Sequence, residues 1–273
     1  MRRVSAVVNT LNEEHRLREC LESLRWADEI VLVDMHSEDQ TREVAESFGC
    51  RVLLHERLEH VEPARQFSVD AAEHDWVLVV DPDERVSSGL ADWIRSQSDS
   101  SEVNGFRIPR RNHYGTRWMK CCGWFPDAQL RLYNRQYASY SDRMHRGLTI
   151  EGKVETLPAH GEAYLNHMCF DSLEDRFGSI NRYSSIVATD LGLSGRRVGA
   201  MELIGRTFLT FARAYFLQQG WRAGGVGAIL ALERSVDTYF KYAKVWEFEQ
   251  RASKTGQQSR KMADIEGCIY NGK

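Results

Sequence analysis

The sequence predicts an α/β domain with a mostly parallel sheet and flanking helices, followed by a helical C-terminal region. Three observations support this prediction. Short apolar runs alternate with segments of helical periodicity through the first third of the chain. The connections between them are short, as in parallel sheets with right-handed crossovers. From about Asp175 onward, apolar residues recur at helical spacing.

Strands and helices are expected to alternate before residue 85. The strands are apolar runs, typical of strands buried on both faces, at 4–8, 30–33, 51–54 and 76–80. The helices have apolar residues every three or four positions, at 17–24, 41–48 and 64–72. Ser37 is the expected N-cap of the second helix, because its hydroxyl can accept from free backbone N–H groups.

Polar residues follow three of these strands, at 9–14, 34–39 and 81–84. Ligands of open parallel sheets bind at the carboxyl ends of the strands. We therefore expect a binding site where these three segments meet. No G-x-G-x-x-G and no G-x-x-x-x-G-K followed by Ser or Thr occurs in the sequence, which excludes the usual dinucleotide and P-loop sites.

The last of these segments, Asp81-Pro82-Asp83-Glu84, places carboxylates directly after a buried strand. Carboxylates in this arrangement suit a hard divalent cation that is bound partly by protein and partly by phosphate oxygens. Such an ion neutralises a diphosphate leaving group. An isolated Asp-x-Asp is common in turns. Its position at the end of a strand favours metal binding over a role in a turn. The sequence predicts Mg²⁺ or Mn²⁺ as cofactor.

The composition is that of a folded globular protein, with 42 % hydrophobic and 27 % charged residues. The cysteines form no C-x-x-C pair, and no leader-like segment or apolar run of about 18 residues occurs. We expect reduced thiols, a cytoplasmic location and no membrane span.

Charge is unevenly distributed along the chain. Residues 1–174 carry 21 Lys and Arg against 30 Asp and Glu, a net charge of −9, whereas residues 175–273 carry 15 against 9, a net charge of +6. This asymmetry indicates two parts with different partners, unless it is chance in surface composition.

Four segments in this order and spacing resemble glycosyltransferase family 2, whose members have the GT-A fold, a Rossmann-like mostly parallel sheet. They are NTLNEE at 9–14, VDMHSEDQT at 33–41, PARQF at 63–67 and WVLVVDPDER at 76–85, and WFPDAQLRL at 124–132 extends the likeness. The resemblance covers residues 4–170. Within the family, the chain is similar to bacterial enzymes that add glucose or a related hexose to the lipopolysaccharide inner core. The resemblance implies a GT-A catalytic domain at 1–170 and a helical region at 171–273.

The resemblance also implies a nucleotide-sugar donor and the residues that bind it. Asn9 and Glu13 would hold the base and ribose, and Asp34 would accept a hydrogen bond from the uracil or ribose. Arg65 would approach the ribose or diphosphate, and Asp81 would hold the ribose. A turn or cap role remains the alternative for Asn9 and Asp34, and a surface ion pair for Arg65.

The implied metal ligands are Asp83 and His167. His167 resembles a family histidine close to the metal and diphosphate, and imidazole is a common ligand of divalent cations. The alternative is a packed or solvated histidine. For Asp39, a local role at the start of a helix is preferred over ligand binding.

An inverting transfer needs a general base for the acceptor hydroxyl, and Asp127 is the expected base. A turn carboxylate without a catalytic role is the alternative. Arg131 follows at i+4 and is expected to steady Asp127 or to pair with phosphate. Trp124 and Trp118 are expected to stack on sugar rings, and Trp124 in particular to contact the acceptor. The alternative for both is packing in the core, which is more common for tryptophan.

Similar proteins often carry His-Glu where this sequence has His145-Arg146. His145 is therefore an expected acceptor or phosphate contact, but the glutamate is absent. This departure favours Asp127 as the base, with Glu151 as a substitute.

The C-terminal region combines apolar and basic residues at helical spacing. The first stripe comprises Met201, Ile204, Phe208, Phe211, Ala212 and Tyr215. After a glycine-rich break at 220–225, a second segment at 226–249 interleaves aromatic residues with Arg234, Lys241 and Lys244. The pattern suits interfacial helices on an anionic membrane surface. The alternative is a helical pair packed on the catalytic domain or on another subunit.

These observations predict an inverting, metal-dependent glycosyltransferase that moves a hexose, glucose above all, from a UDP-sugar to a lipid-linked or lipopolysaccharide core acceptor. It is expected at the inner face of the cytoplasmic membrane, as a peripheral protein without a nucleic-acid partner. A sugar nucleotidyltransferase is one alternative, but it needs a glycine-rich loop with a basic residue, which segment 9–14 lacks. A non-catalytic sugar- or lipid-binding protein that retains the fold is the other, because Arg146 departs from the family pattern.

Overall fold

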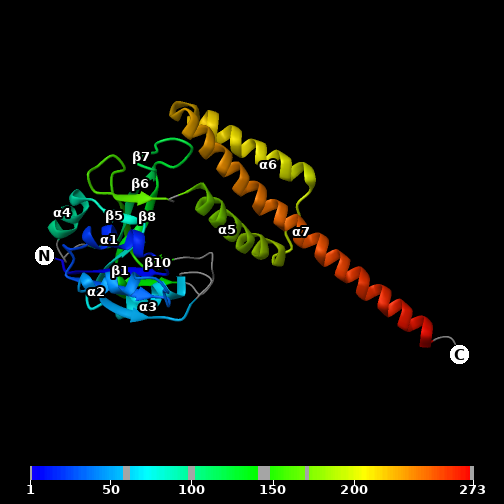
Figure 1. Ribbon diagram of the computed structural model, residues 1–273, viewed down its shortest axis with the longest axis horizontal. Helices are drawn as coiled ribbons and strands as arrows, with labels where there is room; N and C mark the ends of the chain where they lie inside the picture. The colour runs from blue at the N-terminus through cyan, green and yellow to red at the C-terminus, as the bar shows by residue number, and fades with distance from the viewer. Residues whose placement is uncertain (1, 58–61, 98–101, 141–147, 170–171, 271–273) are drawn as a thin grey trace. The chain divides into compact units, whose positions relative to one another are not determined.

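The computed structural model describes residues 2–57, 62–97, 102–140, 148–169 and 172–270. The chain forms two compact units. One comprises Met1–Met119 and Trp124–Cys169, and we call it the sheet unit. The other comprises Lys120–Gly123 and Phe170–Lys273, contains the long helices α5, α6 and α7 of Figure 1, and is called the helical unit.

The sheet unit begins with four parallel strands in the spatial order β3-β2-β1-β4. They are β1 (Val4–Thr10), β2 (Glu29–Asp34), β3 (Arg51–Leu54) and β4 (Trp76–Val80). Every residue of β1 and β4 is buried. Successive side chains of a strand point to opposite faces, so Val8 joins one core with Leu17, and Val7 joins a second core with Val69. The predicted parallel sheet with a buried core on each face is confirmed.

The sheet continues beyond β4 with strands of mixed direction. They are β8 (Ala128–Asn134), β6 (Val103–Tyr114), β12 (Leu165–Met168) and β5 (Glu84–Val86). β8 is antiparallel to β4 and β6, and β12 is antiparallel to β5. β7 (Arg117–Trp118) and β11 (Lys153–Thr156) pair with β6, while β9 (Ala138–Tyr140) and β10 (Leu148–Ile150) form a separate two-stranded sheet. The β5–β12 pairing brings residues near 167 beside the Asp81-Pro82-Asp83-Glu84 segment.

The helices of the sheet unit are α1 (Glu14–Glu22), α2 (Thr41–Ser47), α3 (Glu62–Ala71) and α4 (Ser88–Ser96). The first three follow β1, β2 and β3 as the sequence predicts. The prediction that Ser37 caps the second helix is wrong, because Gln40 occupies the N-cap position of α2. Ser37 instead donates to the buried Asp34 through its backbone N–H and its hydroxyl.

The helical unit consists of α5 (Leu173–Leu193), α6 (Ala200–Ala212), a π-helical turn η2 (Arg213–Leu217), a 3₁₀ turn η3 (Gly220–Ala223) and α7 (Gly225–Tyr270). α7 runs beside both α5 and α6 (Figure 1). The segment Lys120–Gly123 joins this unit through a hydrogen bond from Cys122 N to Gln218 O of 2.9 Å. Among the described residues, no helix is both long enough and apolar enough to cross a membrane.

Candidate active site

The polar residues predicted to bind the donor end neighbouring strands of the sheet. The register of β1 with β2 places Asn9 opposite Val33 and the next residue opposite Asp34. The register of β1 with β4 places Val8 opposite Val80, one residue before Asp81. The carboxyl ends of these strands therefore meet at one edge, as predicted for a parallel sheet.

The loops after β1 and β2 are tied to each other by hydrogen bonds. Asn12 N donates to Ser37 Oγ at 2.8 Å, and Glu13 N donates to Thr41 Oγ1 at 2.9 Å. Asp39 accepts from the backbone N–H of Thr41 at 3.0 Å, which is the local role at a helix start that the sequence favours. These bonds give the loops a defined shape beside the sheet edge.

Asn9 and Asp34 lie under these loops. Asn9 Nδ2 donates to Ser68 Oγ at 3.2 Å, whereas its buried Oδ1 accepts no hydrogen bond from the described residues. Asp34 is fully buried and accepts from Ser37 and, at 3.4 Å, from Thr10 Oγ1. Asn9 therefore has an unused acceptor, while the carboxylate of Asp34 is already engaged. The predicted nucleotide contacts of Asn9, Glu13 and Asp34 stay predictions.

Asp81 lies between two arginines. Arg65 Nη2 donates to Asp81 Oδ1 at 2.6 Å, and Arg131 Nη2 donates to Asp81 Oδ2. Burial raises the pKa of Asp81, but the charges of Arg131 and Arg65 outweigh burial and hold this pKa well below its usual range. The carboxylate is therefore ionised. Arg65 forms an ion pair with Asp81, and its predicted approach to the ribose or diphosphate stays a prediction.

Glu84 forms the buried centre of this charge network. Its side chain is fully buried and accepts from Arg131 at 2.8 Å and from Arg110 at 3.2 Å. Its other oxygen accepts from the backbone N–H of Asp81 at 3.0 Å. Buried charges persist in proteins when they are paired and hydrogen bonded, so Glu84 and its arginines fix the position of the Asp81 segment.

Asp83 and His167, the predicted metal ligands, face each other. Asp83 Oδ2 lies 3.3 Å from His167 Nε2, because β12 pairs with β5 and places His167 opposite Glu84. Both side chains are largely buried but retain some exposure, 23 % for Asp83 and 18 % for His167. No cluster of three or more His, Cys, Asp or Glu suited to a metal occurs among the described residues. If a divalent cation binds here, the pair would supply two protein ligands, and donor oxygens and water would supply the rest, as in Mg²⁺ and Mn²⁺ sites with phosphate substrates.

Asn112 orients this histidine. His167 Nδ1 lies 2.6 Å from Asn112 Oδ1, which only accepts, so the hydrogen is placed on Nδ1. The Nε2 atom then faces Asp83 and, in the neutral ring, has the lone pair that binds metal. Burial lowers the pKa of His167, but hydrogen bonds with Asp83 and Cys169 outweigh burial and raise the pKa to about 10. A cation that binds here therefore displaces a proton from the histidine.

Asp127, the predicted base, is also tied to Asn112. Its Oδ2 accepts from Asn112 Nδ2 at 2.9 Å and from Arg110 Nη2 at 2.8 Å, and its Oδ1 accepts from Gln129 Nε2 at 2.6 Å. Burial raises the pKa of Asp127, but the hydrogen bond from Asn112 and the charge of Arg110 outweigh it and lower this pKa. The carboxylate is half-buried and ionised at neutral pH, the state that a general base requires.

The expectation that Arg131 steadies Asp127 is wrong. The i+4 spacing brings side chains together on a helix, but Arg131 lies in strand β8, where four residues span about 13 Å. Arg131 therefore reaches Asp81 and Glu84, and Arg110 of β6 pairs with Asp127. A phosphate contact by Arg131 stays a prediction.

The remaining predicted contacts have varied surroundings. Trp124 is half-buried, and its carbonyl accepts from Asn112 at 2.9 Å. Trp118 packs edge-on against Phe125 with ring centroids 5.3 Å apart. Glu151 is exposed. His145 and Arg146 lie outside the described residues.

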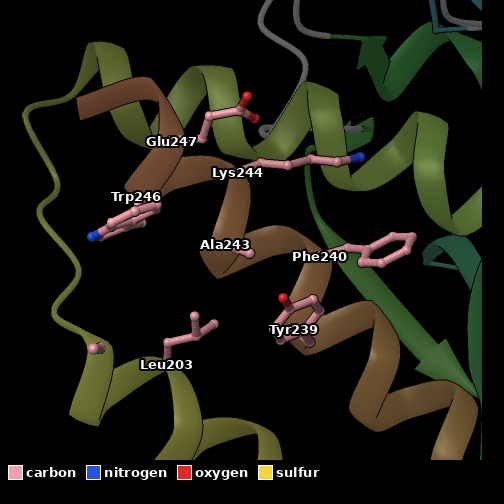
Figure 2. A pocket seen from close by; sticks show the side chains of 8 residues that line it. Leu203, Tyr239, Phe240, Ala243, Lys244, Trp246 and Glu247 are labelled. Atoms are coloured by element: carbon pink, nitrogen blue, oxygen red, sulfur yellow. The ribbon is translucent and has the colours of Figure 1, made fainter. Parts of the chain in front are cut away.

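The helical unit has an apolar pocket of about 510 Å³ between α6 and α7 (Figure 2). Leu203 and the aromatic side chains of Tyr239, Phe240 and Trp246 line it. Lys244 also lines the pocket, but its amino group donates to Asn181 O of α5 at 2.6 Å. A pocket with this lining is suited to an apolar group rather than to a nucleotide diphosphate. The candidate active site is therefore the one in the sheet unit.

The fold and this network define the class of protein. The chain belongs to glycosyl transferase family 2, whose family model matches residues 5–144, and it is a glycosyltransferase. It is 28 % identical over 256 residues to the lipopolysaccharide core biosynthesis glycosyltransferase LpsC of Rhizobium meliloti (strain 1021), covering 89 % of this chain and 92 % of the relative. It is 24 % identical over 274 residues to an uncharacterized glycosyltransferase of Rickettsia typhi, covering 92 % and 89 % of the two chains.

A solved structure supports the fold. The mannosyltransferase PcManGT of Pyrobaculum calidifontis, in complex with GDP-Man and Mn²⁺, has a TM-score of 0.50 and 16 % sequence identity to this chain, with 90 % of this chain and 86 % of that chain covered. The predicted GT-A fold with a C-terminal helical extension is confirmed.

Proposed function

We propose that this glycosyltransferase inverts the configuration of the sugar that it transfers, using a UDP-hexose, above all UDP-glucose, and an acceptor in the lipopolysaccharide core or on a lipid carrier. The observation on which the proposal depends most is the Asn112 bridge, which joins the Asp83–His167 pair to the ionised Asp127. The proposed cation site and the proposed base are thereby joined in one hydrogen-bond network. The likeness to LpsC along nearly the whole chain supports the acceptor class.

On the donor side, Asp83 and His167 would hold Mg²⁺ or Mn²⁺, which neutralises the charge that develops on the diphosphate leaving group. Asn9 would use its free Oδ1 to accept a hydrogen bond from the nucleoside, since that buried acceptor is otherwise unsatisfied. Glu13 and Asp34 would complete the base and ribose contacts. Arg131 and Arg65 keep Asp81 ionised, so that Asp81 could accept from ribose hydroxyls.

On the acceptor side, Asp127 would take the proton from the acceptor hydroxyl as that oxygen bonds to the anomeric carbon and the bond to the diphosphate breaks. The hydroxyl proton passes to Asp127, and the electron pair of the broken bond leaves with UDP. Arg110 and Asn112 hold one carboxylate oxygen, and Gln129 holds the other. Trp124, His145 and Arg131 would contact the acceptor or the phosphates.

A transfer assay tests this function. Purified full-length protein is incubated with Mn²⁺, lipopolysaccharide core acceptor and a panel of UDP-, GDP-, ADP- and CDP-sugars, and nucleoside diphosphate release and glycan mass are measured. We expect release and a mass gain of one hexose with UDP-glucose. Donor binding without turnover on any acceptor would instead indicate a non-catalytic sugar-binding protein.

We also propose that the protein works as a peripheral protein at the inner face of the cytoplasmic membrane, with an anionic membrane surface as partner. The basic character of residues 175–273 supports this location, as does the acceptor class. Co-sedimentation of the full chain with anionic vesicles tests it, and a protein that stays in the supernatant at low salt contradicts it.

A further inference from the structure

The outer face of α6 and of the turn after it is apolar and exposed. Six large apolar side chains there are each more than half exposed: Met201, Ile204, Phe208, Leu209, Phe216 and Leu217. We call this set the α6 face. A helix of a globular protein normally turns its apolar stripe toward the core, and a contiguous exposed apolar patch marks an interaction site. The α6 face is therefore a surface that lacks its partner in the isolated chain.

The opposite side of α6 is already packed, so the orientation of the helix is set. Ser235 Oγ of α7 donates to Thr207 O of α6 at 2.7 Å, and Thr238 Oγ1 of α7 donates to Thr210 Oγ1 at 3.3 Å. Leu203 packs against the buried cluster that contains Val245. Because these contacts anchor α6 to α7 through its other side, the α6 face is left pointing away from α7.

Positive charge surrounds the α6 face. Residues 196–222 contain a single carboxylate, Glu202, and five arginines, a net charge of +4: Arg196, Arg197, Arg206, Arg213 and Arg222. Glu202 is ion-paired with Arg196 and Arg206, and Arg213 and Arg222 are exposed. Trp221, half exposed at 56 %, lies beside Arg222. An apolar stripe with arginines at its margin and a tryptophan at its end is the composition of helices that lie in anionic lipid interfaces.

Two basic residues of α7, Lys244 and Arg234, are engaged within the helical unit. Lys244 donates to Asn181 and to Ser184 Oγ at 2.7 Å, and Arg234 donates to the carbonyl of Cys122. These cations hold the helical unit together. The sequence-based expectation of lipid-facing cations is therefore wrong for Arg234 and Lys244, whose cationic groups bond to protein. For Lys241 it stays a prediction.

We propose that α6, η2 and η3 form the membrane-docking surface of the protein, lying in the plane of an anionic phospholipid monolayer. The six apolar side chains of the α6 face enter the acyl region, and the exposed Arg213 and Arg222 contact headgroup phosphates. This inference gives a surface to the peripheral association proposed above. α6 has 13 residues, about 20 Å at 1.5 Å per residue, which is shorter than a hydrocarbon core of about 30 Å. It therefore lies along the membrane rather than across it.

A second copy of this chain fits the α6 face less well. A two-fold contact presents the same patch from both sides. The arginine margin of one copy would then meet the arginine margin of the other, and like charges across an interface oppose association. Lipid phosphates provide the opposite charge.

Vesicle co-sedimentation of the full chain tests the proposal. The vesicles contain phosphatidylcholine with phosphatidylglycerol, or phosphatidylcholine alone. We expect the wild type to bind the anionic vesicles, and the variant Ile204→Ser/Phe208→Ser/Leu209→Ser to lose at least about tenfold in partition coefficient, since three apolar side chains no longer leave water. A matched control, Tyr183→Ser/Leu193→Ser, removes side chains of α5 that are 67 % and 74 % exposed, and should bind like the wild type.

A charge variant keeps the test independent of the first. Arg213→Glu/Arg222→Glu should weaken binding to anionic vesicles at low salt and change binding to neutral vesicles little, because a neutral surface has no negative potential to attract arginine. Equal binding by the wild type and the triple serine variant overturns the proposal. The proposal is also overturned, in favour of self-association, by two results together. These are that the wild type does not bind vesicles, and that light scattering shows a dimer for the wild type and a monomer for the triple serine variant. Hydrolysis of UDP-glucose is measured on the same samples without lipid. It tests the proposed enzyme function independently of vesicle binding, so that failure of one proposal can be told from failure of the other.

Discussion

The two units of this chain differ in their most prominent features, a buried charge network in the sheet unit and an exposed apolar surface in the helical unit. The sheet unit buries charge: Glu84 and Asp34 are fully buried, and Arg131 is only 8 % exposed. The helical unit exposes hydrocarbon: Met201 is 83 % exposed and Leu217 is 79 % exposed. Buried charged groups require pairing and fixed geometry, whereas a large exposed apolar surface marks a site of interaction with another molecule. The first arrangement suits chemistry and the second suits docking.

This contrast predicts that substitutions in the two units have separable effects. Changes in the buried network of the sheet unit should alter turnover, metal affinity or stability and leave vesicle binding unchanged. Changes in the α6 face should do the reverse. A variant in one unit that moves both properties together would break the distinction.

The largest expected effect is that of Asp83→Ala. If Asp83 holds the cation, its loss should lower kcat/KM on the order of 10³-fold, because charge stabilisation by a metal is worth several kcal/mol and about 1.4 kcal/mol is a factor of ten. Asp92→Ala, an exposed carboxylate of α4, is the matched control and should keep the wild-type rate. Turnover of Asp83→Ala at wild-type level would remove Asp83 from the site.

Asp127→Asn should lower kcat about 10²-fold while UDP-glucose binds with nearly wild-type affinity, since the amide keeps the shape but cannot take a proton. The pKa of Asp127 is lowered, so its base form persists as the pH falls toward the ordinary carboxyl pKa of about 4. In the wild type at saturating Mn²⁺ and donor, kcat should therefore show no acid limb from this group above about pH 5. A wild-type kcat in Asp127→Asn would transfer the role to another carboxylate such as Glu151.

Arg131→Met should destabilise the sheet unit by about 3 kcal/mol, because it leaves Glu84 buried with Arg110 as its remaining cation and Asp81 with Arg65. Urea unfolding followed by circular dichroism measures this. Arg107→Met, in the same sheet on exposed β6 surface, should change stability by less than about 0.5 kcal/mol. Similar losses in both variants would mean that the buried network does not hold the site.

Asn112→Leu should weaken Mn²⁺ binding by about 10- to 100-fold, since residues that orient a metal-binding histidine have effects of that size. Calorimetric titration of Mn²⁺ in the presence of UDP measures it. Asn104→Leu changes an asparagine of the same strand that bonds to Glu151 O instead, and it should keep the wild-type affinity. Unchanged Mn²⁺ affinity in Asn112→Leu would detach Asn112 from the metal site.

Much of the sheet unit follows from local patterns. The runs at β1 and β4 are buried on both faces, so their continuous apolar character predicts strands. The family resemblance further pairs Asp83 with His167, which lie far apart in the sequence. That contact depends on β5 pairing with β12, which no local pattern reveals.

Other parts of the site need the structure. Arg110 and Asn112 lie two residues apart in β6, so they share a face. Two polar residues at alternate positions of a mostly buried strand are the signal that could have identified them, because such positions are normally apolar. The roles of Glu84 and Gln129 likewise depend on which strand lies beside them. The i+4 spacing of Asp127 and Arg131 predicts a contact only on a helix, and Arg131 lies in strand β8.

In the helical unit, helical periodicity predicts the row of apolar side chains that begins at Met201. It does not predict whether protein or lipid contacts them. A stripe packed on protein and a stripe facing lipid have the same spacing. The structure shows which side of α6 packs on protein, because Ser235 and Thr238 of α7 bond to Thr207 and Thr210. It also shows that Lys244 is engaged by α5, a contact between helices distant in sequence.

The most direct test of the proposed metal-assisted transfer is calorimetric titration of UDP-glucose into the full chain, with Mn²⁺ and after chelation, for the wild type and for His167→Gln. The Asp83–His167 pair predicts strong binding by the wild type only when Mn²⁺ is present, and loss of that metal dependence in His167→Gln. Equal affinity of the wild type with Mn²⁺ and with chelator would contradict a cation held between Asp83 and the donor diphosphate.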